Sequence, residues 1–259
     1  MITGLGALLD LTDAALVAAV LVFARVGGVM ALLPGFGEQV IPARIRLALT
    51  VAVTLVVWPM LAPEVVRVGP ARPFLAMLLI EATIGLMLGL AIRLMVMALQ
   101  LAGVIAAQST SLSQMFGTGL TPEPMPAIGS ILMFAGITLA LAAGLHVKAA
   151  VAMARSYEIL PMGLPVPAED VARWGTARVA QAFGLGFSLA APFVIAAFAY
   201  NLALGFINRA MPQLMVSFIG APAITAGGLL LLMLAAPVIL HFWGHRLDLV
   251  LADPLATPR

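Results

Sequence analysis

Six long apolar runs constrain this chain more than any other feature of its sequence. A helix needs about 20 apolar residues to cross the hydrocarbon core of a bilayer. Only 9% of the residues are charged, compared with about 25% in ordinary soluble proteins. The chain therefore cannot cover itself with polar surface, and lipid or other proteins must cover it. The runs lie at approximately 14–33, 45–62, 73–105, 127–154, 179–207 and 214–243.

These runs are predicted to be helices, because lipid cannot satisfy backbone hydrogen bonds and a helix satisfies them within one segment. We expect an all-α, polytopic membrane-associated fold of helical hairpins, in a single domain over residues 1–259. Some helices should be broken, because Pro192, Pro222 and Pro237 lie inside the last two runs. The polar stretch at about 155–178 is predicted to be a loop, with a short amphipathic helix in its second half. It is too short for a separate catalytic domain.

Composition and local motifs argue against several classes of function. The chain has no cysteine, and its net charge of +2 is too small to indicate nucleic-acid binding. We find no nucleophile–base pair, phosphate loop or carboxylate dyad, so we expect neither an enzyme nor a cofactor. His241, His245 and Asp248 share a helical face, but the first and last lie about 10 Å apart along the axis, too far for one metal ion. We interpret them, with Trp243, as a polar end of the last run at the membrane surface.

Three charged residues, Arg25, Glu81 and Arg93, lie inside apolar runs. A charge at the centre of a bilayer costs roughly 2.5–3.5 kcal/mol on insertion scales, so we expect these charges to be paired. The sequence leaves open whether Glu81 pairs with Arg25 or with Arg93. Buried pairing between helices or subunits is favoured over a proton or ion pathway. Gly85 and Gly89 have the GxxxG spacing that allows two helices to approach closely.

A polar cluster marks the end of the fifth run. Asn201 and Asn208 are seven residues apart and therefore face the same way on a helix. Amides in membrane helices usually hydrogen-bond to a neighbouring helix, and we predict this packing role for both rather than substrate binding. Arg209, Pro212 and Gln213 follow, and we assign them to the turn and to helix or subunit packing.

The stretch QSTSLSQMFGTGLTPEPMP, residues 108–126, interrupts the apolar pattern between the third and fourth runs. Its glycines and prolines prevent a regular helix over 114–126. Irregular backbone at membrane depth must be buried in protein or line a watery cavity, although a simple surface loop is the alternative. Apolar side chains here could close a pore by excluding water and ions, with the glycines as hinges. The candidate plug residues are Leu112, Met115, Phe116, Gly117, Gly119 and Leu120.

Three stretches together resemble the FliR family of flagellar type III export-gate proteins over essentially the full chain. The first, FARVGGVMALLPGFGEQVIPARIRLALT (residues 23–50), leads from a helix through a P-G-F-G turn into a basic second helix. The second is 108–126 with the run that follows it. The third, LALGFINRAMPQLMVSFIGAPAITAGGLLLL (residues 202–232), has the layout N-R-x-x-P-Q followed by I-G-x-P. The homologous virulence secretion proteins are similar, and the N-R-A-x-P-Q stretch favours the flagellar branch.

The resemblance implies a subunit of the flagellar export gate in the bacterial cytoplasmic (inner) membrane, at the basal body. Such a subunit joins FliP and FliQ, with FlhB attached, and unfolded flagellar subunits pass through the assembly. The resemblance also maps the plug loop to about 106–126, beside a methionine ring of FliP, and implies tilted hairpins packed against partners. The alternative from another class is a stand-alone secondary transporter or channel controlled by Arg25, Glu81 and Arg93.

Overall fold

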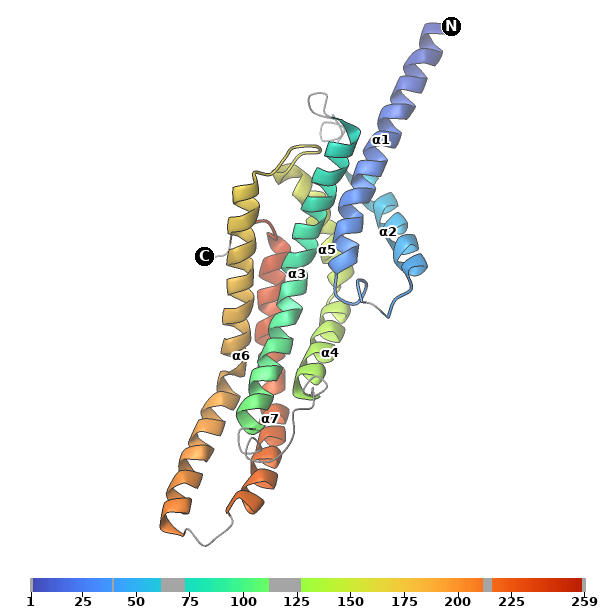
Figure 1. The fold of residues 1–259 in the computed structure, drawn as a ribbon. Helices are drawn as coiled ribbons and strands as arrows, with labels where there is room; N and C mark the ends of the chain where they lie inside the picture. The colour runs from blue at the N-terminus through green and yellow to red at the C-terminus, as the bar shows by residue number, and fades with distance from the viewer. Residues whose placement is uncertain (1, 39, 62–72, 112–126, 212–215, 258–259) are drawn as a thin grey trace. The chain divides into compact units, whose positions relative to one another are not determined.

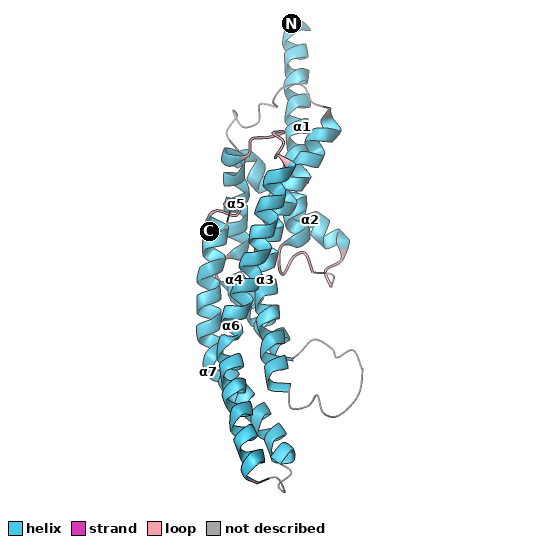
Figure 2. Ribbon diagram, turned by 60° about the vertical axis from the view of Figure 1, so that its left-hand side comes forward, coloured by secondary structure: helices cyan, strands magenta, loops and turns pink. Residues whose placement is uncertain are grey.

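The computed structural model describes residues 2–38, 40–61, 73–111, 127–211 and 216–257. Helices make up nearly all of these residues, and no strand occurs among them (Figure 2). The predicted all-α fold is therefore confirmed. The α-helices, labelled in Figure 1, are α1 (Ile2–Leu32), α2 (Ala43–Val57), α3 (Phe74–Ser111), α4 (Ala127–Ala142), α5 (Leu145–Ile159), α6 (Ala168–Ala210) and α7 (Val216–Ala252). The short 3-10 helix η1 (Trp58–Met60) follows α2.

Five segments in the described part of the chain are long and apolar enough to cross a membrane. The α4–α5 pair passes the same test as one broken span, which brings the number to six. The predicted apolar runs therefore correspond to spans of a multi-pass membrane protein. The five single segments are Ala15–Leu32, Ala43–Met60, Phe74–Ser109, Ala168–Ala210 and Ala223–Ala252.

The fourth apolar run is the one that is broken, and its break lies at a glycine. Gly144 precedes α5 with a φ of +80°, a left-handed conformation that glycine adopts without the steric cost of a side chain. Pro192, Pro222 and Pro237 lie within continuous helices instead. The breaks expected at these prolines are not found, because one missing helix hydrogen bond does not by itself end a helix whose other bonds are kept.

The polar segment at 155–178 forms less loop than the sequence suggested. Residues 155–159 belong to α5, and α6 begins at Ala168, so that only 160–167 lie outside helices. Glu169 and Asp170 occupy the first turn of α6, and Arg209 occupies its last turn. Acidic side chains at the start of a helix and basic side chains at its end are favourable to its dipole. The expected short amphipathic helix is therefore the beginning of a 43-residue helix.

The described chain forms two compact units, each made of segments that are distant in sequence. The first comprises Met1–Leu94, Leu141–Arg178 and Asp248–Arg259. Apolar side chains of α1, of the first half of α3 and of α5 form its core, including Val22, Val26, Ile84, Leu88 and Met153. The second unit comprises Met95–Ala140 and Val179–Leu247. Its core takes side chains from the second half of α3 and from α4, α6 and α7, including Leu99, Leu132, Phe193 and Trp243.

Candidate functional site: a buried ion pair and the contacts around it

Arg25 of α1 and Glu81 of α3 form an ion pair at the centre of the first unit. Arg25 donates from Nε to Glu81 Oε2 over 2.6 Å and from Nη2 to Oε1 over 3.2 Å. Both side chains are 0% exposed. This contact settles which arginine pairs with Glu81, a question that the sequence left open.

Further polar groups surround the pair, and they come from α5 and from the residues after it. Arg25 Nη1 donates to Ser156 Oγ (2.9 Å) and Nη2 to the carbonyl of Leu160 (3.0 Å). The backbone N–H of Gly163 donates to Glu81 Oε1 (2.9 Å), and the guanidinium of Arg25 lies 3.6 Å from the ring centroid of Tyr157. A buried ion pair is tolerated when additional hydrogen bonds offset the loss of water, and these contacts provide them.

Glycines bring α1 and α3 into backbone contact beside the ion pair. A Cβ on Gly28 would lie 2.7 Å from Leu86 N and 2.8 Å from Ala82 O, both in the backbone of α3. A Cβ on Gly85 would overlap the backbone of Arg25, and one on Gly89 would lie 3.0 Å from Val29 O. The two glycines of the GxxxG motif, Gly85 and Gly89, thus lie against the part of α1 that contains Gly28. Small residues on both helices permit such a close crossing.

Arg93, the third charge within the runs, has a different partner. It pairs with Glu38, in the turn between α1 and α2, and both side chains remain about one-third exposed. Arg46 of α2 donates to the carbonyl of Glu38 (2.8 Å). This turn also holds the P-G-F-G stretch, where Gly35 has a φ of +83°. The second ion pair therefore joins α3 to the turn, apart from the Arg25–Glu81 pair.

The predicted plug residues lie outside the described part of the chain. Leu112, Met115, Phe116, Gly117, Gly119 and Leu120 all fall within 112–126, on which the structure is silent. Residues 106–111, which the resemblance included in the plug loop, are the last residues of α3.

The polar cluster of the fifth run lies at the end of α6. We expected Asn201 to hydrogen-bond to a neighbouring helix. Instead, its Nδ2 donates to the carbonyl of Ala197 in its own helix (2.8 Å). Asn208 and Arg209 are exposed, and Pro212 and Gln213 lie outside the described residues. Among the described residues, the Asn201 amide therefore bonds within its own helix and Asn208 and Arg209 are exposed, so that their role in subunit packing stays a prediction.

Trp243 of α7 has a role in packing that the sequence did not indicate. Its side chain is 0% exposed, and its indole N–H donates to the carbonyl of Met95 in α3 (2.7 Å). The expectation of a tryptophan at the membrane surface is wrong, because Trp243 fills the core between α3 and α4, against Gly136. Asp248, in the same predicted polar end, pairs with Lys148 of α5 (2.7 Å).

A second unexpected cluster holds the residues that follow α7. Arg178, which is 3% exposed, donates from Nη2 to the carbonyls of Asp253, Pro254 and Ala256. Trp174, one turn earlier in α6, donates to the carbonyl of Pro254 (3.2 Å). The i, i+4 spacing of a tryptophan and an arginine was the available signal, but their partners are backbone atoms about 75 residues away.

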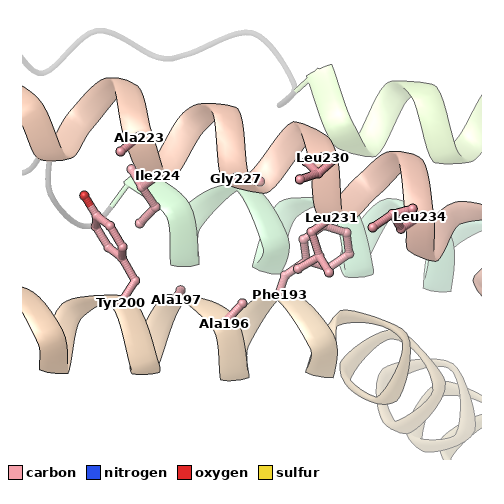
Figure 3. A pocket seen from close by; sticks show the side chains of 11 residues that line it. Phe193, Ala196, Ala197, Tyr200, Ala223, Ile224, Gly227, Leu230, Leu231 and Leu234 are labelled. Atoms are coloured by element: carbon pink, nitrogen blue, oxygen red, sulfur yellow. The ribbon is translucent and has the colours of Figure 1, made fainter.

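An apolar pocket of about 310 Å³ lies between α6 and α7 in the second unit (Figure 3). Phe193, Ala197, Ile224 and Leu231 line it, and Tyr200 contributes the one hydroxyl among the labelled side chains. A site for a polar small molecule needs several convergent polar groups, which this lining does not supply. Among the described residues, no three His, Cys, Asp or Glu side chains are grouped closely enough to hold a metal ion.

Fold and contacts together define a class: a multi-pass, all-α membrane protein whose charged residues in the apolar runs are used in contacts between its own elements. The comparison with known families gives the particular group. The family described as Bacterial export proteins, family 1, matches residues 16–250, and the chain belongs to this family. The predicted FliR-family membership is therefore confirmed.

Individual relatives align over most of this chain and most of their own length. The flagellar biosynthetic protein FliR of Caulobacter vibrioides is 37% identical over 233 residues, which cover 88% of this chain and 92% of the relative. The FliR protein of Aquifex aeolicus is 30% identical over 86% of this chain and 87% of its own. The FliR protein of Escherichia coli is 28% identical over 85% of each.

Proposed function

We propose that this chain is a subunit of the flagellar type III protein-export gate and is required for flagellum assembly. The observation that carries the proposal is the family match over residues 16–250, together with relatives named flagellar biosynthetic protein FliR that align along most of their length. We place the chain in the cytoplasmic membrane, at the flagellar basal body. Its role there is transport of protein rather than enzymatic chemistry.

Partner subunits are the second part of the proposal, and the apolar surface supports it. Only 17% of the segment Ala43–Met60 is buried within the chain, and only 22% of an 18-residue window within Ala223–Ala252. On α6, Phe187, Phe198 and Phe206 are each more than 60% exposed. A helix that is apolar on all sides must be covered by lipid or by other proteins. We assign FliP, FliQ and FlhB as the proteins that share this cover with lipid, and unfolded flagellar subunits as the cargo.

The third part concerns closure of the conduit by the segment that follows α3. We assign the plug to Leu112, Met115, Phe116 and Leu120, whose apolar side chains would exclude water and ions from a narrow passage. Gly117 and Gly119 would give the backbone the freedom to move aside.

Deletion of 112–120 in the assembled complex tests the plug. We expect a higher leak of small ions across the cytoplasmic membrane, because the deletion removes the apolar barrier. The control is Glu169→Gln, which changes an exposed polar side chain in the first turn of α6 and should leave the leak unchanged. An unchanged leak in a deletion variant that accumulates normally would refute the plug.

A stand-alone transporter remains the rival function, and copurification separates the two. Arg25 and Glu81 are fully buried and hydrogen-bonded to each other, which disfavours their use on a solute pathway. The export-gate proposal requires that FliP and FliQ copurify with the tagged chain from solubilised membranes. It also requires that loss of the chain abolishes filament assembly. A chain that purifies alone and carries a small solute in vesicles would overturn it.

A further inference from the structure

The C-terminal end of α5 needs partners for its backbone carbonyls. The last four carbonyls of a helix accept no hydrogen bond from within the helix, and they carry the negative end of its dipole. Basic side chains often meet this need, but α5 has none in its last turn. The residue after α5, Leu160, leaves the helical conformation with a φ of −123°.

Arg25 of α1 supplies the missing cation. Its guanidinium bonds the carbonyl of Leu160 and the hydroxyl of Ser156, which itself donates to the carbonyl of Met153. The Tyr157 ring lies against the same guanidinium. All these groups belong to the last turns of α5 or follow it directly, so that Arg25 occupies the position of a C-terminal cap provided by another helix.

Glu81 of α3 completes the arrangement on the next residues. A four-residue turn over 161–164 is closed by the bond from Leu164 N to Pro161 O (3.1 Å). Its third residue, Gly163, has a φ of +73°, as a type II turn requires. The Gly163 N–H points to Glu81 Oε1 (2.9 Å). The cation thus faces a carbonyl and the carboxylate faces an N–H, so each charge has the sign that its backbone partner needs.

We propose that Arg25 and Glu81 act as a positioning pair that caps the end of α5 and fixes the turn over 161–164. This role goes beyond the joining of α1 to α3, to which the glycine crossing also contributes. The planar fork of arginine is essential to it, because three acceptors in different directions are bonded at once. A lysine at position 25 would keep the charge and the pairing with Glu81 but not this set of bonds.

Two single-cysteine reporters test the proposal in the full-length chain, which contains no cysteine of its own. Met162→Cys reports on the turn, and Val29→Cys reports on the α1–α3 crossing; the native side chains are 3% and 1% exposed. The measurement is the rate of thiol modification by N-ethylmaleimide in detergent. The variants are Arg25→Lys and Arg25→Gln, and the matched control is Arg93→Lys, which makes the same change in the other ion pair of α3.

We expect Arg25→Lys to raise the modification rate at position 162 by about tenfold or more, because local opening exposes the thiol. The rate at position 29 should stay the same, and Arg93→Lys should change neither rate. Arg25→Gln should raise the rate at position 162 further. If Arg25→Gln fails to fold, the lysine variant decides alone. An unchanged rate at position 162 in Arg25→Lys, or an equal rise at both positions, would overturn the proposal.

Discussion

The adjacent glycines of α1 allow a sharp test of the α1–α3 crossing, because only one of them faces α3. Gly28→Ala would place its new methyl 2.7 Å from Leu86 N and 2.8 Å from Ala82 O. Gly27→Ala would place its methyl 3.8 Å from the Thr50 side chain, which is ordinary contact. The two substitutions share the helix, the chemistry and the gain in helix propensity, so they differ in the contact with α3.

The magnitude follows from the distances. Ordinary contact needs about 3.5 Å, so α1 and α3 must separate by about 0.8 Å, and a gap of this size loses roughly a quarter to a half of the dispersion energy. Such overpacking costs about 1–3 kcal/mol. The shift also stretches the 2.6 Å bond between Arg25 and Glu81, three residues from Gly28, and breaking a buried pair costs about 3–5 kcal/mol.

The helix-propensity gain of about 0.5–1 kcal/mol offsets part of this loss. We therefore expect Gly28→Ala to lower the free energy of unfolding by about 2–4 kcal/mol, allowing for partial relaxation of the helices. Gly27→Ala should raise it by about 0.5–1 kcal/mol. A denaturant titration of the detergent-solubilised chain, followed by tryptophan fluorescence, measures both. Equal stability of the two variants, or a more stable Gly28→Ala variant, would show that α1 and α3 are not in backbone contact at Gly28.

Two further predictions concern the contacts that the sequence did not reveal. Trp243→Phe should lower the free energy of unfolding by about 1 kcal/mol, because the hydrogen bond to the Met95 carbonyl is lost. The control is Trp58→Phe, at a partly exposed site. An equal loss of unfolding free energy in both variants would contradict the prediction. Arg178→Met should release the residues after α7, so that carboxypeptidase removes them about tenfold faster or more. Substitution of the exposed Arg173 by Met is the control, and identical digestion of both variants would show that Arg178 does not hold these residues.

The sequence alone determined the class of fold and the family. A span of about 20 apolar residues can be recognised locally, because lipid imposes the helix whatever the rest of the chain does. The number of spans and the membrane location therefore followed from hydropathy. Family membership followed from motifs such as P-G-F-G and N-R-A-M-P-Q, whose order along the chain needs no structure.

The tertiary structure decided which residues meet. Glu81 had two candidate arginines, and the choice of Arg25 depends on the packing of α1 against α3, 56 residues away. Trp243 was predicted to lie at the membrane surface because of its residue type and its polar neighbours. In the folded chain it lies in the core, where its indole N–H bonds a carbonyl of α3 and its ring fills the space beside Gly136. The break at Gly144 and the continuity of α6 through Pro192 likewise depend on the surroundings of the backbone. Hydropathy acts on one segment at a time, whereas pairing and packing depend on segments that only the folded chain brings together.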